Sequence, residues 1–337
     1  NLARFAAERE LKLNITILEG RDFEKPGPAG CNKCAGILSS ELLQKMKTVG
    51  LEIPQDVIQA ELKEYILHIG EHKVPIHQPD PSRRILSVYR GGGPRLGETP
   101  HPHSFDAWLL SQAQKHGATL LPERVQQVEQ GEKPVVKTTH HSLEVDLVVL
   151  ATGVNSRHPL DKSWGYIPPL TVTMNQDELP TSHDTSAEYS DESAHIFVGY
   201  PQGLIFGGVI PKGRYANVSL LGRELRPNAM EEFLEAHGFA ALYEGDVPRL
   251  CGCSPQVAIT PAKGYYHDRL VAVGDAAITR LYKDGIGSAF IAAEAAARTA
   301  VLGGISQEDF ARQYRPVCQK IAGDNQYGKR LFALWDL

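Results

Sequence analysis

The sequence lacks several features that would each point to a particular class of protein. Its longest apolar helical stretch, residues 286–302, contains Glu294 and Arg298, so we expect a buried or amphipathic helix there and not a membrane span. The first residues show no pattern of a secretion signal. The formal net charge is -5 and no basic stripe is present, so nothing in the charge pattern favours a nucleic acid as partner.

Cysteine is scarce and odd in number. The five cysteines form two close pairs, Cys31/Cys34 and Cys251/Cys253, and Cys318 stands apart. An odd count in a chain of 337 residues argues against a secreted disulfide scaffold and favours a reducing, cytoplasmic compartment. The two pairs suggest zinc, but Cys-x-Cys is the wrong spacing for a zinc knuckle, so we predict no metal site.

The apolar content is ordinary, and the chain is long enough for two cores. Residues 1–10 predict a helix, 13–20 a strand and 104–118 an amphipathic helix, while "VDLVVLATG" (145–153) predicts a strand buried on both faces. Residues 164–253 alternate in short segments typical of an antiparallel sheet. The predicted fold class is α/β, with a discontinuous Rossmann-like domain and a second, antiparallel β domain.

Glu19 ends the first predicted strand. Helix, strand and then an acidic residue is the order found in a dinucleotide-binding βαβ unit, where the carboxylate accepts hydrogen bonds from ribose hydroxyls. The Gly-x-Gly-x-x-Gly fingerprint that should come first is absent, because the sequence starts inside what would be the first helix. We therefore expect the first strand and its phosphate-binding turn to be missing from the printed sequence. On its own, Glu19 is equally well explained as a polar strand end.

Two later strands also end in small or acidic residues. Ala151-Thr152-Gly153 follows one of them and lets the backbone pass close to a flat ligand or a diphosphate, although a simple tight turn would use the same residues. Gly274-Asp275 follows the other. A carboxylate at the carboxyl end of a strand lies where ligands bind in α/β sheets, and it can accept hydrogen bonds from a polyol.

A helix without a Ser or Thr cap is predicted to begin at Gly285-Ile286-Gly287. Its free N–H groups and the positive end of its dipole favour negative charge, such as the charge on the N1/O2 edge of a reduced flavin. The glycines leave room for that ring, and Asp275 would hold the ribityl chain. Lys283 would support the same charge if it points inward, and is otherwise part of a solvated turn.

These markers, in this order, resemble the FAD-dependent oxidoreductases of the aromatic-hydroxylase type and, within that superfamily, the geranylgeranyl reductase family. Four stretches are similar to that family's flavin loop, its Phe-Asp-x-x-Leu helix, its substrate-cavity segment and its flavin-closing motif: "CNKCAGILS", "HSFDAWLLSQAQKHGA", "GGVIPKGRYANVSLLG" and "GDAAITRLYKDGIGSAF". Two positions depart from the pattern. Gly207-Gly208 replace an aromatic residue, and His103 replaces an Arg two residues before Phe-Asp.

The resemblance implies FAD as cofactor and hydride transfer from reduced FAD to a C=C bond of a prenyl or other apolar substrate. NADPH or a ferredoxin would be the external electron donor. The implied cofactor-binding residues are Glu19, Gly36, Val125, Ala151, Thr152, Gly153, Gly274, Asp275, Gly285, Ile286 and Gly287.

The resemblance also aligns Cys34 with the family's flavin-loop cysteine. The thiol would face the flavin as a proton donor or tune its potential, and the alternative is a small buried apolar residue. Tyr215, Tyr265 and Tyr282 are further proton-donor candidates that the sequence does not rank.

The expected FAD-binding domain comprises residues 1–70, 101–163 and 255–315, and the substrate domain comprises 71–100 and 164–254. Residues 316–337 are expected to form a C-terminal helix or tail that docks on the body or contacts a membrane surface. The protein would then be cytoplasmic, either free or peripheral at a membrane.

Two other kinds of function remain open. The first keeps the fold and changes the reaction: a monooxygenase would need an oxygen-reactive flavin and a polar substrate pocket, and a halogenase would show Trp-x-Trp-x-x-Pro, which the sequence lacks. The second is a non-catalytic flavin electron carrier or redox sensor, in which the cysteine pairs would switch partners.

Overall fold

The computed structural model describes residues 1–31, 35–80, 82–181, 191–199, 203–222, 225–238, 250–281 and 284–335, with the side chains of the last helix described as far as residue 330. The chain divides into two compact units. Unit 1 consists of Asn1–Arg21, Ser111–Thr171 and Gln256–Leu337, and unit 2 of Asp22–Leu110 and Val172–Pro255. Both units are discontinuous in sequence.

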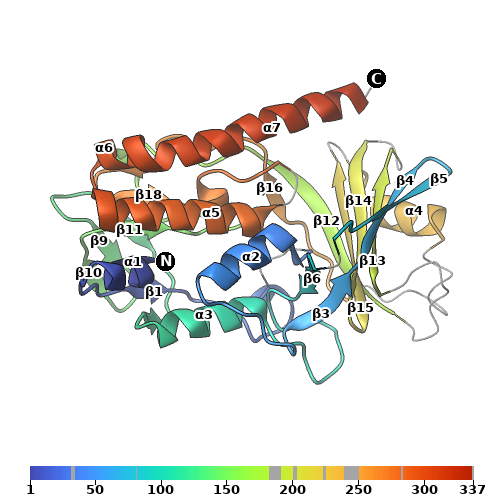
Figure 1. Cartoon of the computed structure of the whole chain (residues 1–337), viewed down its shortest axis with the longest axis horizontal. Coiled ribbons are helices and arrows are strands. Elements are labelled where there is room, and N and C mark those ends of the chain that lie inside the picture. Colours follow the sequence, from blue (N-terminus) through green and yellow to red (C-terminus); the bar gives the residue numbers. More distant parts are fainter. Residues whose placement is uncertain are drawn as a thin grey trace. The chain divides into compact units, whose positions relative to one another are not determined.

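Unit 1 combines helices with short strands (Figure 1). Its strands are β1 (Thr16–Leu18), β7 (Thr119–Leu121), β8 (Gln127–Glu129), β9 (Val135–Lys137), β10 (Ser142–Glu144), β11 (Val148–Leu150), β16 (Gln256–Ala258), β17 (Tyr266–His267) and β18 (Leu270–Ala272). Its α-helices are α1 (Leu2–Glu8), α5 (Gly285–Arg298), α6 (Gln307–Asp309) and α7 (Arg315–Trp335). Shorter 3-10 or π turns are η2 (Lys162–Trp164), η4 (Gly274–Ala276), η5 (Thr299–Gly303) and η6 (Phe310–Tyr314).

Two parallel strand pairs define the α/β part of unit 1. β1 pairs with β7, and β11 pairs with β18, whose other neighbour is the antiparallel strand β17. The strands β8, β9 and β10 form a separate antiparallel sheet. Because parallel strands end at the same edge of a sheet, residues that follow β11 and β18 are brought together.

The strand buried on both faces is β18 and not β11. Leu270 and Ala272 of β18 belong to one apolar core, while Val271 and Val273 belong to a second core with residues of α5, η6 and α7. Val149 of β11 is 40% exposed. The prediction for residues 145–153 was therefore wrong about burial: Val148 and Leu150 pack on one core, while Val149, which points to the other face of the sheet, is exposed.

Helix α5 is the apolar helix noted in the sequence. Together with η5 it forms a stretch, Gly285–Gly303, that is long and apolar enough to cross a membrane by composition. Ala292 and Ala296 pack against the strand and helix residues of the second core, and α5 lies beside α7 (Figure 1). This packing is that of a core helix, as the sequence predicts.

Unit 2 is built around a mixed sheet whose strands are antiparallel except for the parallel pair β4 and β13. Its strands are β2 (Ile37–Leu38), β3 (Ile58–Leu62), β4 (Glu64–Ile69), β5 (His72–His77), β6 (Ile85–Val88), β12 (Thr171–Pro180), β13 (Ser193–Val198), β14 (Leu204–Lys212) and β15 (Tyr215–Gly222). The described helices are η1 (Gly27–Ala29), α2 (Ser40–Thr48) and α4 (Ala229–Ala236), while α3 (Phe105–Lys115) begins in unit 2 and ends in unit 1. The unit 2 strands of the main sheet have the order β12-β15-β14-β13-β4-β5, and a smaller sheet has the order β2-β6-β3.

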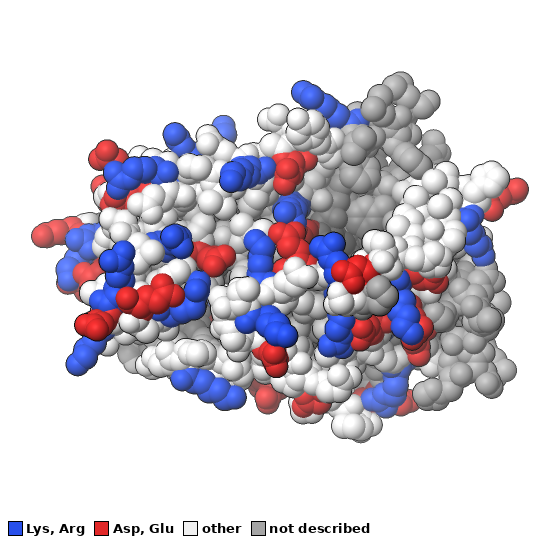
Figure 2. Space-filling view, viewed as in Figure 1, with Lys and Arg blue, Asp and Glu red and all other residues white. Residues whose placement is uncertain are grey.

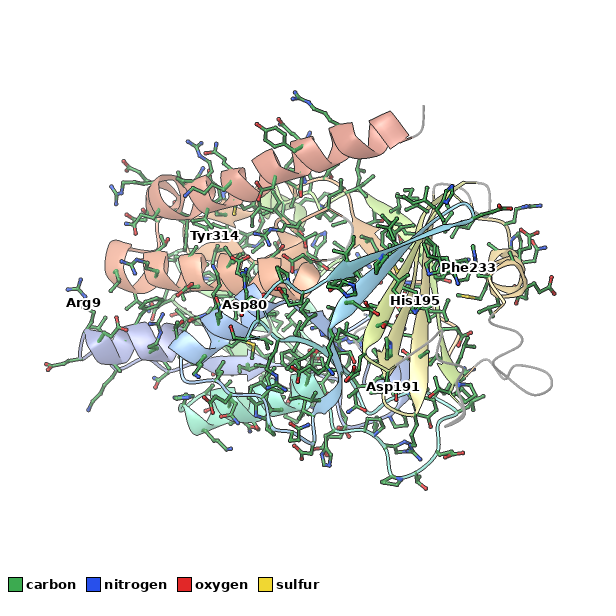
Figure 3. All side chains as sticks on the ribbon, turned by 45° about the vertical axis from the view of Figure 1, so that its right-hand side comes forward. Arg9, Asp80, Asp191, His195, Phe233 and Tyr314 are labelled. Atoms are coloured by element: carbon green, nitrogen blue, oxygen red, sulfur yellow. The ribbon has the colours of Figure 1, made fainter. Side chains whose placement is uncertain are left out.

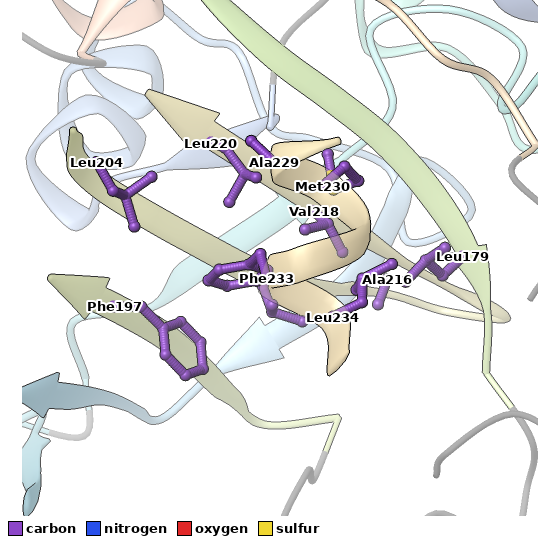
Figure 4. Packing of buried hydrophobic residues seen from close by; sticks show 11 residues of the cluster. Leu179, Phe197, Leu204, Ala216, Val218, Leu220, Ala229, Met230, Phe233 and Leu234 are labelled. Carbon is purple, nitrogen blue, oxygen red and sulfur yellow. The ribbon is translucent and has the colours of Figure 1, made fainter. Parts of the chain in front are cut away.

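One face of the main sheet in unit 2 carries an apolar core under α4. Phe233 and Met230 of this helix pack on Val218, Leu220 and neighbouring residues of β13, β14 and β15 (Figure 4). Figure 3 marks Phe233 on α4 and His195 on β13. Gly207 of β14 has a packing reason, because a Cβ there would lie 2.7 Å from the Phe233 ring. This glycine lets the helix approach the sheet closely.

The predicted α/β fold class, with parallel and antiparallel sheets, is confirmed. The compact units differ from the expected domain bounds at several places. Residues 22–70 and 101–110, which we assigned to the FAD-binding domain, lie in unit 2, and residues 164–171, which we assigned to the substrate domain, lie in unit 1. For residues 22–70 the reason is strand pairing: β4 joins the main sheet beside β13, and β3 pairs with β6.

Charged side chains of both signs are mixed over the face shown in Figure 2. Lys and Arg residues alternate there with Asp and Glu residues, as the small net charge suggests. This face therefore offers no extended patch of one sign.

Candidate cofactor site

The carboxyl ends of β11 and β18 meet in unit 1. The Val273 N–H donates to the Leu150 carbonyl at 2.9 Å, so Ala151 and Gly274 leave adjacent strands at the same edge. Gly274 has a φ of +60°, and a Cβ on it would lie 3.0 Å from the Ala289 Cβ of α5. This glycine allows both the turn after β18 and the close approach of α5.

Asp275 faces the first residue of α5. Its carboxylate oxygens lie 3.5 and 3.7 Å from the position that a Cβ on Gly285 would occupy. The N-cap residue is Asp284, whose side chain makes no capping hydrogen bond to the helix. Instead, its Oδ2 accepts a hydrogen bond from Arg280 Nη1 at 2.7 Å. The first turn of α5 therefore starts without a side-chain cap, as the sequence predicts, and beside a carboxylate.

Gly287 is required by the same arrangement. A Cβ at this position would collide with the Asp284 carboxylate. Any larger residue would push Asp284 away from Arg280. The glycine pattern Gly285-Ile286-Gly287 thus has two separate reasons: Gly287 accommodates Asp284, while Gly285 places no side chain against the Asp275 carboxylate.

Glu19 and Val125 form a second group. The Glu19 N–H donates to the Leu121 carbonyl, and a Cβ on Gly20 would be 3.2 Å from the Arg124 backbone nitrogen, so the two turns touch. Arg21 engages the Glu19 carboxylate through its backbone N–H (2.9 Å), its Nε (3.2 Å) and its Nη2 (3.2 Å). A carboxylate offers about four acceptor positions, so ribose hydroxyls would have to share it with Arg21 or displace it.

Both groups border one apolar core. Leu18, next to Glu19, and Val125 pack against the cluster that contains Leu150, the residue before Ala151, and Ala276, the residue after Asp275. The structure thus gathers most of the residues predicted from the sequence around a single core of unit 1. Their roles toward a cofactor remain predictions.

The residues of this site fit a flavin nucleotide. Gly153 has a φ of +65° and a Cβ there would meet no atom within 4 Å, so the backbone after β11 is open to a ligand. Thr152 Oγ1 is buried and has no hydrogen-bond partner among the residues that the structure describes. Buried hydroxyls are almost always hydrogen-bonded, so this one indicates a polar ligand group or water. Acceptors, helix N–H groups and open backbone together suit FAD.

One of the proposed positions lies in unit 2, and three lie outside the described residues. Gly36 belongs to unit 2, where its φ is +73° and a Cβ would collide with the Val88 carbonyl. This explains the glycine by packing and leaves its predicted role toward a cofactor untested. Cys34 and Lys283 lie outside the described residues, as does Tyr282.

The other tyrosine candidates have structural partners. The Tyr215 hydroxyl accepts a hydrogen bond from the Glu98 N–H at 2.7 Å in unit 2. Tyr265 packs against Tyr314 in a core of unit 1, and burial raises its pKa, with a smaller contribution from nearby Cys318. A phenol with a raised pKa is a weaker acid, so Tyr265 is a poor proton donor.

A buried ionic cluster in unit 2 was not singled out from the sequence. Lys212 Nζ lies 3.7 Å from Glu178 Oε1 and 4.4 Å from the centre of the Tyr89 ring, and all three residues are at most 6% exposed. Glu178 also accepts hydrogen bonds from Asn217 Nδ2 (2.8 Å) and the Tyr89 hydroxyl (3.4 Å). Burial raises the pKa of Glu178, and the Lys212 ammonium only partly offsets this.

Polar residues continue from this cluster along β12 and β15. Ser219 donates to Asn217 Oδ1 at 2.7 Å, and Gln176, opposite Ser219 in the register, is 4% exposed. The Gln176 Oε1 has no hydrogen-bond partner among the described residues. The members of this cluster are far apart in sequence. The only sequence signal for them was the similarity of "GGVIPKGRYANVSLLG", which contains Lys212, to the family's substrate-cavity segment.

Arg90 and Asp106 form a bidentate pair in unit 2. Arg90 Nε and Nη2 donate to Oδ1 and Oδ2 of Asp106, each at 2.9 Å. Asp106 is the acidic residue of the Phe-Asp helix start, where the sequence shows His103 in place of the usual Arg. Asp106 is thus bound by Arg90, which follows β6, and not by a residue of the loop just before α3.

No disulfide joins the described cysteines, Cys31, Cys251, Cys253 and Cys318, to one another. Burial raises the pKa of the Cys251 thiol. Among the residues that the structure describes, no group of three or more His, Cys, Asp or Glu side chains is arranged to hold a metal ion.

Comparison with known proteins concerns the fold of the chain. No family model matches the sequence. The chain is 28% identical over 268 residues to Protein FixC of Escherichia coli strain K12, across 70% of this chain and 58% of FixC. The chain thus spans less than two thirds of the length of these curated relatives.

The fold is shared with flavin-dependent enzymes. A geranylgeranyl bacteriochlorophyll reductase-like protein from Thermoplasma acidophilum superposes with a TM-score of 0.70 at 16% identity, covering 96% of this chain and 83% of that one. The enzyme 2-methyl-3-hydroxypyridine-5-carboxylic acid oxygenase superposes with a TM-score of 0.68 at 14% identity, covering 98% and 88%. The chain therefore has the fold of FAD-dependent oxidoreductases, and the predicted resemblance is confirmed at that level.

Proposed function

We propose that this protein is an FAD-dependent oxidoreductase that reduces a C=C bond of an apolar, prenyl-type substrate. The observation that carries the cofactor assignment is the Asp275 carboxylate beside the uncapped first turn of α5, at the carboxyl ends of two parallel strands. Bound FAD would supply hydride chemistry at this place.

The chain's own residues would hold the nucleotide by ordinary polar contacts. Asp275 accepts hydrogen bonds from ribityl hydroxyls, and the N–H groups at the start of α5 stabilise negative charge on the ring. Glu19 accepts hydrogen bonds from the ribose hydroxyls after the Arg21 side chain is displaced from its carboxylate. Gly153 and Gly285 matter through the side chains that they lack, since a Cβ at either would occupy ligand space.

The choice of reduction is supported by the similarity to the reductase-like protein and by the sequence motifs that pointed to the same family. NADPH or a ferredoxin would serve as electron donor, and Cys34 is the candidate for the proton that accompanies the hydride. The halogenase motif Trp-x-Trp-x-x-Pro is absent from the sequence, so halogenation is not proposed.

Hydroxylation of a polar substrate is the second candidate. The polar cluster of Lys212, Glu178 and Asn217 on the main sheet of unit 2 favours it, because a purely hydrocarbon substrate needs no such groups. The similarity to an oxygenase points the same way.

The first experiment tests the cofactor. Purified protein is titrated with FAD, and absorbance near the flavin bands together with fluorescence quenching gives the dissociation constant. The wild type should bind one FAD, and Asp275→Ala should bind at least tenfold more weakly, since a hydrogen bond to a charged group contributes about 1.5–3 kcal/mol. A wild-type protein that refuses FAD would refute the proposal.

The second experiment separates the reactions. The protein with bound FAD is reduced with dithionite in D₂O under anaerobic conditions, so that the hydride of the reduced flavin carries deuterium from the solvent, and is mixed with a prenyl alcohol. Deuterium on the saturated product supports reduction. Substrate-stimulated oxygen consumption with a hydroxylated product supports the second candidate. Flavin that cycles without any product supports an electron carrier and counts against both.

A further inference from the structure

The segment between η4 and α5 is held by side chains on both sides. On one side, Asn325 of α7 binds it twice: Nδ2 donates to the Thr279 carbonyl at 2.8 Å, and Oδ1 accepts from the Leu281 N–H at 2.7 Å. On the other, Ser288 Oγ of α5 accepts from the Arg280 N–H at 2.9 Å. Three successive residues thus have a backbone group bound by a side chain, although the segment belongs to no helix or strand.

Asn325 binds the segment as a neighbouring strand would. One donor and one acceptor of its amide meet a carbonyl and an N–H two residues apart. Only this orientation of the amide works, because the flipped one would set donor against donor and acceptor against acceptor. One turn further along α7, the Leu281 side chain packs over Gly328, with its Cδ2 3.5 Å from where a Cβ would stand. This face of α7 is therefore fitted to the segment.

The position of the segment matters for the cofactor. It connects Asp275, just after β18, to Asp284 and Gly285 at the start of α5. Movement of this segment would change how the Asp275 carboxylate faces the first turn of α5. The strand β18, the body of α5 and Ile278 at the start of the connection are fixed by apolar cores, while the backbone of Thr279–Leu281 is held by the polar contacts of Asn325 and Ser288.

We propose that Asn325 is a positioning residue of the FAD site: α7 holds the Thr279–Leu281 segment so that Asp275 and the start of α5 are preorganised for the flavin. The inference rests on the proposed function, since it concerns the cofactor assigned there. It makes the C-terminal helix, whose sequence shows no cofactor motif, a part of the cofactor site.

The experiment compares Asn325→Ala with Gln326→Ala, the neighbouring exposed residue of α7, in the full-length protein. FAD titration should show about tenfold weaker binding for Asn325→Ala, since two neutral hydrogen bonds are lost, and unchanged binding for Gln326→Ala. Amide hydrogen exchange without FAD should accelerate at Leu281 in Asn325→Ala and stay unchanged at core residues such as Ala296.

A second variant keeps the test valid if Asn325→Ala folds poorly. Asn325→Asp has nearly the same shape, but its carboxylate sets an acceptor against the Thr279 carbonyl and should weaken FAD binding at pH 8. The facing Thr279 carbonyl disfavours the charged form and raises the pKa of the new carboxyl above its ordinary value of about 4. Protonation restores a donor, so the affinity of this variant relative to wild type should recover as the pH is lowered from 8 toward 4. A merely structural defect would not recover in acid.

The outcomes separate this inference from the proposed function. Wild-type protein without FAD affinity overturns the proposed function itself. Wild-type protein that binds FAD, with Asn325→Ala and Asn325→Asp binding equally well over this pH range, overturns only the role of Asn325.

Discussion

Gly285→Ala is the substitution that best tests the site, because it should change stability and FAD affinity in opposite directions. A Cβ at Gly285 would lie 3.5 Å from Asp275 Oδ1 and 3.7 Å from Oδ2, which are ordinary contact distances. The residue starts α5, and its φ is not in the left-handed region. Alanine is therefore accepted by the protein and should stabilise it by up to about 1 kcal/mol.

For the ligand the same methyl group is an obstacle. It would stand between the Asp275 carboxylate and the start of α5, where the ribityl chain is expected. An extra methyl group in a well-packed contact costs about 1–3 kcal/mol, which corresponds to about 5- to 150-fold weaker binding. The two effects are separable, because one is measured without FAD and the other by FAD titration.

The matched control is Gly323→Ala in α7. A Cβ there would meet nothing within 4 Å, so the substitution should raise the thermal unfolding temperature in a similar way and leave FAD binding unchanged. Gly285→Ala protein that binds FAD as tightly as wild type would show that the flavin does not pass this point. A loss of stability without FAD would show that the contact geometry at Asp275 is wrong.

Three further predictions concern unit 2. Lys212→Met should destabilise it by about 3–5 kcal/mol in urea unfolding, because Glu178 is left buried without its cation, and the added change Glu178→Leu should restore most of the loss; equal midpoints for the single and double variants would contradict this. Glu178→Gln should flatten the pH dependence of the free energy of unfolding. The pKa of Glu178 is raised in the folded protein, so wild-type stability falls as the pH rises from the ordinary carboxyl pKa through the folded pKa. A wild-type stability that rises over this pH window would refute the sign. Arg90→Lys should cost about 1–2 kcal/mol because the bidentate geometry to Asp106 is lost, while Arg84→Lys at an exposed pair should cost under about 1 kcal/mol; similar costs for both would contradict it.

Sequence reasoning succeeded where the signal is local. The helix at α3, the strand at β1 and the glycine start of α5 all follow from residues within one segment. The prediction that β11 is buried on both faces was wrong, because burial is not a local property. Its apolar run resembles that of a strand covered on both faces, but what packs on each face is decided by distant segments, and they cover both faces of β18 but leave Val149 of β11 exposed.

The ionic cluster and the Asn325 contacts could not be predicted in this way. Lys212 and Glu178 come from different strands, and Asn325 lies 46 residues from Thr279 and 44 from Leu281. Asn is common on helices, and nothing in its neighbours distinguishes this one. Which polar side chains become partners is decided by which ones are buried together.

The sequence by itself determined the order of the strand ends and their chemistry: an acid after β1, small residues after β11, and Gly-Asp after β18. It could do so because strand ends and helix starts are set by residues a few positions apart. Only the tertiary structure decided that β11 and β18 are parallel neighbours, that Asp275 faces Gly285, and that α7 binds the connection between them. These depend on packing between distant segments, where a shared core, and not the local pattern, selects the contacts.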